Sequence, residues 1–298
     1  MTASSKAIAA FGYGVCCLLW LGAAPAQPPG TPLPEGIRGG SELVPERGVE
    51  VRTYRFEETG EDLPYSVFVS SKIKPGSKAP LIVALRGYTG TTLTFVRGTT
   101  VDLAEAGGYI LVGPIGYNNR AGFGVEARPR PGRPPAQAPG AAPAPPLIGG
   151  SAATDPALVT AYSEKDVMNV LERVRREFNI DDRRIYLMGH SQGGGGARHL
   201  AEKYPDIWAG VALLAPALFG VEPTADSNIV HLPVLIAVGD QDSLLPSART
   251  YGEQLKALNA DVEYREFAGL DHGTIILGSQ PTVFAFFAKH VKNRSGAH

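Results

Sequence analysis

The pentapeptide Gly189-His190-Ser191-Gln192-Gly193 places a serine between two glycines at the junction of two unlike segments. The apolar run 184–188 before it predicts a strand, and residues 194–204 after it read as a helix. A G-x-S-x-G turn in this context strains the serine backbone and sets it at a helix N-terminus, where an oxyanion is stabilised. The same pattern also occurs by chance in glycine-rich turns, so the pentapeptide alone leaves the role of Ser191 open.

A candidate base and acid follow two later strands. The predicted strand 234–238 leads into Asp240 and Asp242, and the predicted strand 262–267 leads into His272. A serine hydroxyl needs a base to take its proton, and a neutral histidine needs an acid to orient it. We expect His272 to be the base. We expect Asp242 to be the acid, because Asp240 lies against the strand end and is better placed to stabilise the turn.

A fourth loop could stabilise the developing negative charge. It follows the apolar strand 81–85 and reads Arg-Gly-Tyr-Thr-Gly over residues 86–90. Two backbone N–H groups usually form such an oxyanion pocket, one of them from the residue after the nucleophile. We expect these donors to be the amides of Gln192 and Tyr88, because Gly87 lets the Tyr88 amide turn inward.

Three side chains near these loops are candidate substrate contacts: Arg86, Tyr88 and His190. Arg86 either pairs with a local carboxylate or faces an acidic group of the substrate. Tyr88 either packs on the substrate or forms a wall of the site. His190 occupies the variable position of the turn.

The segments that must position these residues alternate between strand and helix patterns. Continuous apolar runs predict parallel strands that are covered on both faces. We expect helices near 93–106, from an N-cap at Ser163 to Phe178, and near 248–258 and 282–290. Residues 50–292 therefore predict one domain of the α/β class, with a mostly parallel, doubly wound sheet and an antiparallel hairpin at its N-terminal side.

Four other segments are expected to lie outside the regular structure of this domain. Residues 1–26 have one lysine, an apolar run and an Ala-Pro-Ala cleavage site, as in a signal peptide. We expect a secreted or periplasmic protein without stable membrane insertion after cleavage, the alternative being a retained N-terminal anchor. Residues 27–49 read as a Pro/Gly-rich linker and 293–298 as a tail. The Pro-rich stretch 128–146 is expected to be a surface insertion, either a tolerated loop or a lid.

Composition excludes several classes of function. The 298-residue chain has a net charge of −1 and no dense basic cluster, so we expect no nucleic-acid partner. No His, Cys and carboxylate cluster has the spacing of metal ligands, so we expect neither a metal nor an organic cofactor. The oligomeric state is not predicted.

Taken together, the motifs resemble those of the α/β-hydrolase superfamily. They are the Arg-Gly-Tyr-x-Gly loop at 86–90, the GHSQGG turn at 189–194, the GDQDSLLP turn at 239–246 and the LDHG loop at 270–273. The resemblance covers about residues 50–292 and is strongest to secreted bacterial esterases of the polyhydroxybutyrate depolymerase, feruloyl esterase and prolyl-oligopeptidase-like group. The chain departs from that group at Arg86, where the group usually has histidine.

The resemblance implies acyl transfer in two steps. Ser191 would attack a carboxylic ester, His272 would take and return the proton, and Asp242 would fix the imidazole tautomer. Aryl esters or polyester oligomers are the expected substrates. The alternatives are a serine peptidase of prolyl-oligopeptidase type, an acyltransferase, and a non-catalytic binding protein on the same fold.

Overall fold

The computed structural model describes residues 45–46, 48–126 and 145–292. The predicted signal peptide, most of the linker, nearly all of the Pro-rich insertion and the C-terminal tail lie outside these residues. The described part belongs to one unit, Gly39–His298. None of the helices in it is both long and apolar enough to cross a membrane.

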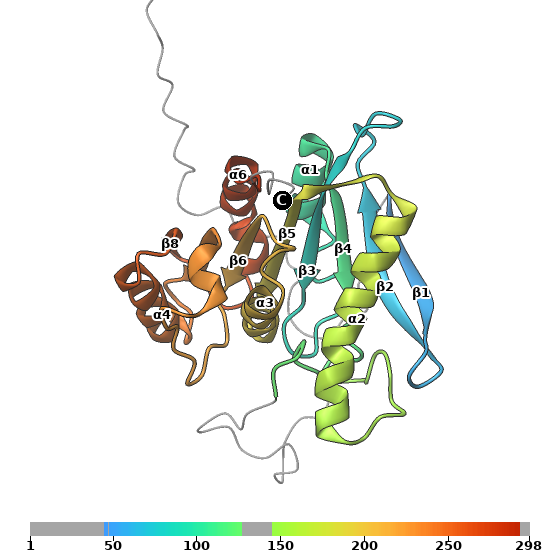
Figure 1. Cartoon of the computed structure of the whole chain (residues 1–298), viewed down its shortest axis with the longest axis horizontal. Coiled ribbons are helices and arrows are strands. Elements are labelled where there is room, and N and C mark those ends of the chain that lie inside the picture. The colour runs from blue at the N-terminus through green and yellow to red at the C-terminus, as the bar shows by residue number, and fades with distance from the viewer. Residues whose placement is uncertain (1–44, 47, 127–144, 293–298) are drawn as a thin grey trace, which may run out of the picture. The chain divides into compact units, whose positions relative to one another are not determined.

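Eight strands form a single sheet in the order β1-β2-β4-β3-β5-β6-β7-β8 (Figure 1). Their bounds are β1 Val49–Phe56, β2 Glu61–Val69, β3 Ala79–Leu85, β4 Ile110–Pro114, β5 Ile180–His190, β6 Gly210–Leu214, β7 Val234–Gly239 and β8 Val262–Phe267. β1 and β2 form an antiparallel hairpin, and β2 is also antiparallel to β4. All other neighbours are parallel. The predicted mostly parallel sheet with its antiparallel hairpin is confirmed.

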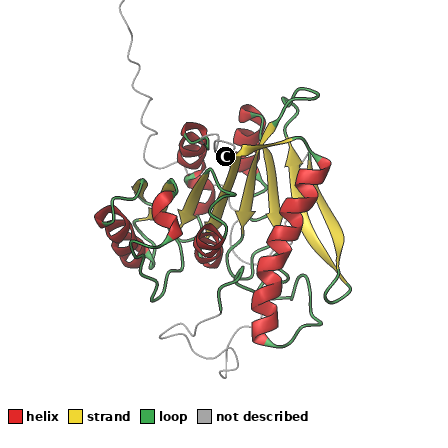
Figure 2. Ribbon diagram, viewed as in Figure 1, coloured by secondary structure: helices red, strands yellow, loops and turns green. Residues whose placement is uncertain are grey.

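Helices cover both faces of the sheet (Figure 2). They are α1 Gly98–Gly107, α2 Pro156–Glu177, α3 Gln192–Lys203, α4 Leu245–Ala257, α5 Ile275–Gly278 and α6 Gln280–Lys289, with a short 3-10 helix, η1, at Asn228–His231. Successive residues of a strand point to opposite faces. In β3, Leu81 and Val83 therefore join the core cluster of α2, α3 and α4, whereas Ile82 and Ala84 join that of α1 and α6.

Helix α2 begins earlier than its apolar pattern predicts. Asp155 is the N-cap, and its carboxylate accepts hydrogen bonds from the amides of Ala157 and Leu158 at 2.8 and 3.1 Å. The predicted cap, Ser163, is buried within the helix and donates to the Thr160 carbonyl. The first two turns were missed because they are exposed or half-buried and lack the apolar spacing of a core-facing helix.

Two other predicted boundaries were also wrong. Helix α1 begins at Gly98, not Leu93, because Arg97 is extended and Gly98 has a positive φ of 51°. Strand β5 extends back to Ile180, which pairs with Ala79 before a shift in register. The strand predicted over 184–188 therefore begins four residues earlier and includes Asp181 and Asp182.

Candidate active site

Four loops that carry the predicted site residues leave the sheet at the same edge. Strands β3, β5, β7 and β8 are parallel, so their carboxyl ends meet there. The residues that follow these ends are Gly87 and Tyr88 after β3, Ser191 after β5, Asp242 after β7 and His272 after β8. The carboxyl edge of a parallel sheet is the usual place for a ligand site in α/β folds.

The turn at Ser191 has the strained geometry that its sequence predicts. Ser191 has φ 56° and ψ −116°, a conformation that a residue with a side chain rarely adopts. A Cβ on Gly189 would overlap the carbonyl of Gly193, and a Cβ on Gly193 would overlap the carbonyls of Leu85 and Arg86. Both glycines are therefore required by the close approach of β5, the start of α3 and the end of β3.

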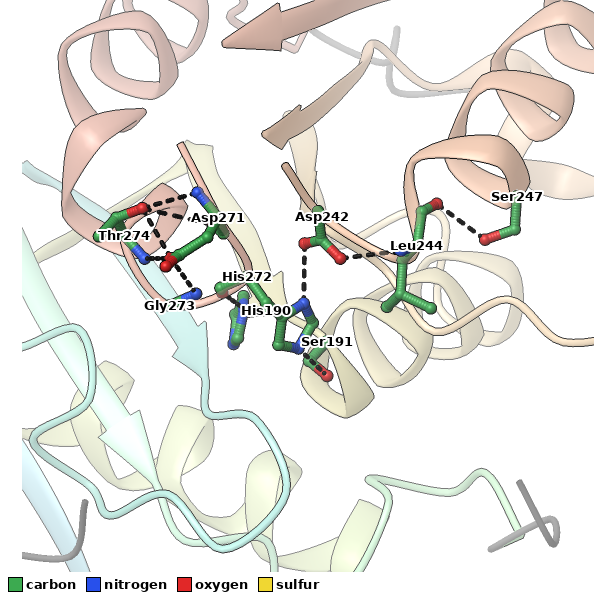
Figure 3. Close-up of polar contacts among 9 residues, drawn as sticks. All are labelled: His190, Ser191, Asp242, Leu244, Ser247, Asp271, His272, Gly273 and Thr274. Carbon is green, nitrogen blue, oxygen red and sulfur yellow. Dashed lines mark hydrogen bonds and ion pairs between the residues drawn. The ribbon is translucent and has the colours of Figure 1, made fainter. Parts of the chain in front are cut away.

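Ser191, His272 and Asp242 form a continuous chain of hydrogen bonds (Figure 3). Ser191 Oγ lies 2.9 Å from His272 Nε2, and His272 Nδ1 lies 2.8 Å from Asp242 Oδ2. Because an ionised carboxylate only accepts, Nδ1 carries the proton and Nε2 is left to accept from the serine hydroxyl. The Asp242 side chain is fully buried, and its other oxygen accepts from the Leu244 amide at 2.8 Å.

The two neighbouring aspartates hold the loops that carry this chain. Asp240 Oδ1 accepts from the Gly269 amide at 2.8 Å, which ties the loop after β7 to the loop after β8. Asp271 Oδ1 accepts from the amides of Thr274 and Gly273, and these bonds lower the pKa of its carboxyl. Both carboxylates thus bind backbone of the loop after β8, as expected of turn residues.

His190 is a buried support of His272, which corrects its predicted role as a substrate contact. Its side chain is 5% exposed, and its Nε2 donates to the backbone carbonyl of His272 at 2.6 Å. The two rings lie with their centroids 4.5 Å apart. Burial, and then the nearby His272, lower the pKa of His190 to about 3. The ring is therefore neutral and adds no charge beside the base.

The predicted oxyanion residues lie next to the serine. A Cβ on Gly87 would lie 3.4 Å from the Ser191 Cβ and 2.9 Å from His190 Nδ1. Gln192 is the first residue of α3, so its N–H has no acceptor within the helix. Tyr88 directly follows Gly87, and its side chain is exposed.

Arg86 is buried within the protein and forms no ion pair with a carboxylate of the described residues, which corrects both predictions for it. It is 1% exposed, and all five of its N–H donors are engaged within the protein. The acceptors are the carbonyls of Gly87, Ile115, Asn118 and Ala121 and the side-chain Oε1 of Gln192. Burial lowers the pKa of Arg86 to about 9, opposed by the charge of Asp166, so it remains a cation at neutral pH.

Within residues 45–46, 48–126 and 145–292, no three His, Cys, Asp or Glu side chains gather into a group that could hold a metal ion.

Parts of the sequence match known hydrolases. A family model described as "alpha/beta hydrolase fold" matches residues 133–232. Cutinase 1 of Thermobifida cellulosilytica is 33% identical over 95 residues, which are 31% of this chain and 34% of that protein. A cutinase of Thermobifida fusca (strain YX) is 33% identical over 95 residues, 31% of this chain and 30% of that protein. The chain thus spans about a third of the length of these curated relatives.

Solved structures match most of the chain. An S-formylglutathione hydrolase from Agrobacterium tumefaciens superposes with a TM-score of 0.60 at 18% identity, covering 82% of this chain and 95% of that one. A ferulic acid esterase from Anaeromyces mucronatus, solved with ferulic acid, superposes with a TM-score of 0.56 at 18% identity. The match covers 86% of this chain and 96% of that one. The sheet order, the strained turn and these superpositions agree: the chain has the α/β-hydrolase fold.

Proposed function

We propose that this protein is a serine hydrolase that cleaves carboxylic esters through an acyl-enzyme. The observation that carries the proposal is the hydrogen-bonded chain from Ser191 through His272 to Asp242, held on a strained turn at the carboxyl edge of the sheet. Each link has the distance that proton transfer requires in the resting state.

The proposed reaction has two matching halves. Ser191 Oγ attacks the ester carbonyl while His272 Nε2 takes its proton, and Asp242 stabilises the resulting imidazolium. The amides of Gln192 and Tyr88 stabilise the negative oxygen of the tetrahedral intermediate. Collapse expels the alcohol, which receives the proton from His272. Water then attacks the acyl-enzyme by the same route and releases the acid.

Aryl esters or polyester oligomers are the proposed substrate class. Tyr88 is 43% exposed and follows Gly87, which lies close to Ser191. An exposed aromatic ring offers a flat apolar surface to an aryl or alkyl group. The names of the matched proteins, cutinases and ferulic acid esterases, support the same class. The composition of residues 1–26 supports a secreted or periplasmic location.

A substrate panel with the Ser191→Ala variant as control tests this function. It comprises p-nitrophenyl esters of increasing chain length, a feruloyl ester, a soluble polyester oligomer and a peptide p-nitroanilide. We expect turnover of the esters by the wild type alone. Peptide turnover without ester turnover would instead indicate a peptidase. A product that changes with added alcohol, at an unchanged rate of acylation, would indicate an acyltransferase.

A further inference from the structure

Arg86 contacts both residues whose amides are proposed to bind the oxyanion. Its Nη1 donates to the backbone carbonyl of Gly87 at 3.0 Å and to Oε1 of Gln192 at 3.3 Å. The Gly87 carbonyl also accepts from the Gly90 amide at 3.0 Å. One buried cation therefore joins the loop after β3 to the first residue of α3.

Holding the Gly87 carbonyl also sets the direction of the Tyr88 N–H. The two groups belong to the same peptide unit, which is planar, and the described backbone contains no cis peptide bond. In a trans peptide the C=O and the N–H point in opposite directions. When the carbonyl faces the buried guanidinium, the Tyr88 N–H therefore faces away from it.

The other donors of Arg86 hold the loop that follows β4. Nε donates to the Ile115 carbonyl and one Nη2 proton to the Ala121 carbonyl, both at 3.0 Å, and the other Nη2 proton goes to Asn118. The guanidinium lies 4.8 Å from the ring centre of Phe123.

This loop is strained and contacts the site directly. Tyr117 and Phe123 both have positive φ, at 62° and 56°, which needs contacts to maintain it. The loop in turn supports the oxyanion residues, because the Thr89 amide donates to the Asn119 carbonyl at 2.7 Å and Gln192 Nε2 donates to the Arg120 carbonyl at 3.0 Å.

We propose that Arg86 is a positioning residue of the oxyanion pocket. By binding five acceptors at once, it fixes the peptide that carries the Tyr88 N–H relative to the start of α3, in place of the histidine usual in the resembled group. A lysine has three donors on one atom and cannot reproduce this planar arrangement. The inference rests on the proposed hydrolase function and assigns its oxyanion geometry to one side chain.

The Arg86→Lys variant tests this role, with Arg184→Lys as the matched control. Arg184 is partly buried, whereas Arg86 is fully buried. Arg184 lies in the first half of β5, away from Ser191, and donates to Asp181 and the Lys78 carbonyl. We expect Arg86→Lys to lower kcat about 10²- to 10³-fold, the loss typical of one oxyanion donor, with KM within about threefold. The inhibition constant of a trifluoromethyl ketone, whose adduct with serine carries an oxyanion, should rise by a similar factor. Arg184→Lys should change neither value.

Hydrogen exchange adds a readout that needs no catalysis. Peptides that cover residues 86–90 and 115–123 should take up deuterium faster in Arg86→Lys than in the wild type. If Arg86→Lys does not fold, Gln192→Met serves instead, because it keeps the backbone N–H of residue 192 and removes both the Oε1 acceptor of Arg86 and the Nε2 donor to the Arg120 carbonyl. That variant should lose about tenfold in kcat and loosen residues 86–90, and wild-type behaviour in it would overturn the proposal.

The outcomes separate this inference from the proposed function. A wild type without ester turnover refutes the proposed function, and unchanged exchange in Arg86→Lys then refutes the positioning role as well. An active wild type and a folded Arg86→Lys with equal kcat refute the positioning role alone. A fall in kcat without weaker ketone binding also overturns it, because the loss would then lie outside the oxyanion pocket.

Discussion

The imidazole of His190 donates from Nε2 to the backbone carbonyl of His272 at 2.6 Å. His190, the residue before the proposed nucleophile Ser191, thus holds the backbone of His272, whose ring contacts the Ser191 hydroxyl. Because the loop after β8 is otherwise exposed around His272, this bond is a direct link between the base and the buried end of β5.

Replacing His190 with phenylalanine should weaken that link. The ring volume is kept, but the His272 carbonyl loses its donor, at a cost of about 1–1.5 kcal/mol. We expect about a tenfold fall in kcat with little change in KM. Ester kinetics check this, with the exposed His231→Gln as a control. Equal kcat in His190→Phe and the wild type would show that the bond does not position the base.

The same variant should flatten the pH dependence of stability. The folded protein keeps His190 neutral down to about pH 3, whereas the unfolded chain takes up this proton near pH 6.5. The wild type should therefore lose free energy of unfolding as the pH falls from 6.5 toward 3, and His190→Phe should lose less. Urea denaturation at pH 7 and pH 5 measures the difference. If the free energy of unfolding changed equally between pH 7 and pH 5 in both proteins, the low pKa of His190 in the folded protein would be contradicted.

Asp242→Asn should remove most of the activity without unfolding the protein. Asparagine can present an N–H to His272 Nδ1 and so favours the wrong tautomer, which leaves no acceptor for the serine proton. We expect kcat to fall roughly 10³- to 10⁴-fold. Asp240→Asn, two residues earlier in the same turn, should stay within about threefold of the wild type. Equal losses in the two variants would argue against Asp242 as the acid.

Two substitutions at Tyr88 should separate its amide from its side chain. Tyr88→Pro removes the N–H and should lower kcat about 10²- to 10³-fold. Tyr88→Ala keeps the N–H and removes the exposed ring, so it should mainly raise KM for aryl esters. Steady-state kinetics on aryl and short alkyl esters distinguish the effects. A small kcat effect of the proline variant would place the second donor elsewhere.

Glu61→Gln should destabilise the protein in a pH-dependent way. Burial opposes ionisation of Glu61, but bonds from the Ser151 amide, Tyr117 and the Ala152 amide outweigh it and lower its pKa to about 2. This stabilisation is complete above pH 4.5 and is lost as the pH falls from 4.5 to 2. The variant should lose about 1–3 kcal/mol at pH 7 and little at pH 2. Chemical denaturation measures this loss. An equal loss in free energy of unfolding at pH 7 and at pH 2 would contradict this account of Glu61.

The sheet and the order of the site residues along the chain could be predicted from the sequence. Apolar runs such as 81–85 and 234–238 are buried on both faces, and this burial is what their composition reports. The tight turn at Gly189 and Gly193 could be predicted as well, because only glycine fits where the start of α3 crosses β3 and β5.

The sequence could not show how deeply loop residues are buried. Arg86 follows a strand and was expected to pair with a local carboxylate or to face an acidic substrate group, but three of its five acceptors are carbonyls in residues 115–121, and only the folded chain brings that loop to it. His190 was misread for the same reason, since its acceptor is a backbone carbonyl 82 residues away. Backbone carbonyls are present in every residue, so no sequence signal marks which of them will bind a side chain.

Labelling with a fluorophosphonate probe tests the central claim most directly. Such a probe bonds covalently to a serine only where a base and an oxyanion pocket activate it. We predict one adduct per chain on Ser191, located by peptide mass spectrometry, and none in a folded Ser191→Ala variant. A well-folded wild type that is not labelled, or a Ser191→Ala variant labelled as fast as the wild type, would contradict the account.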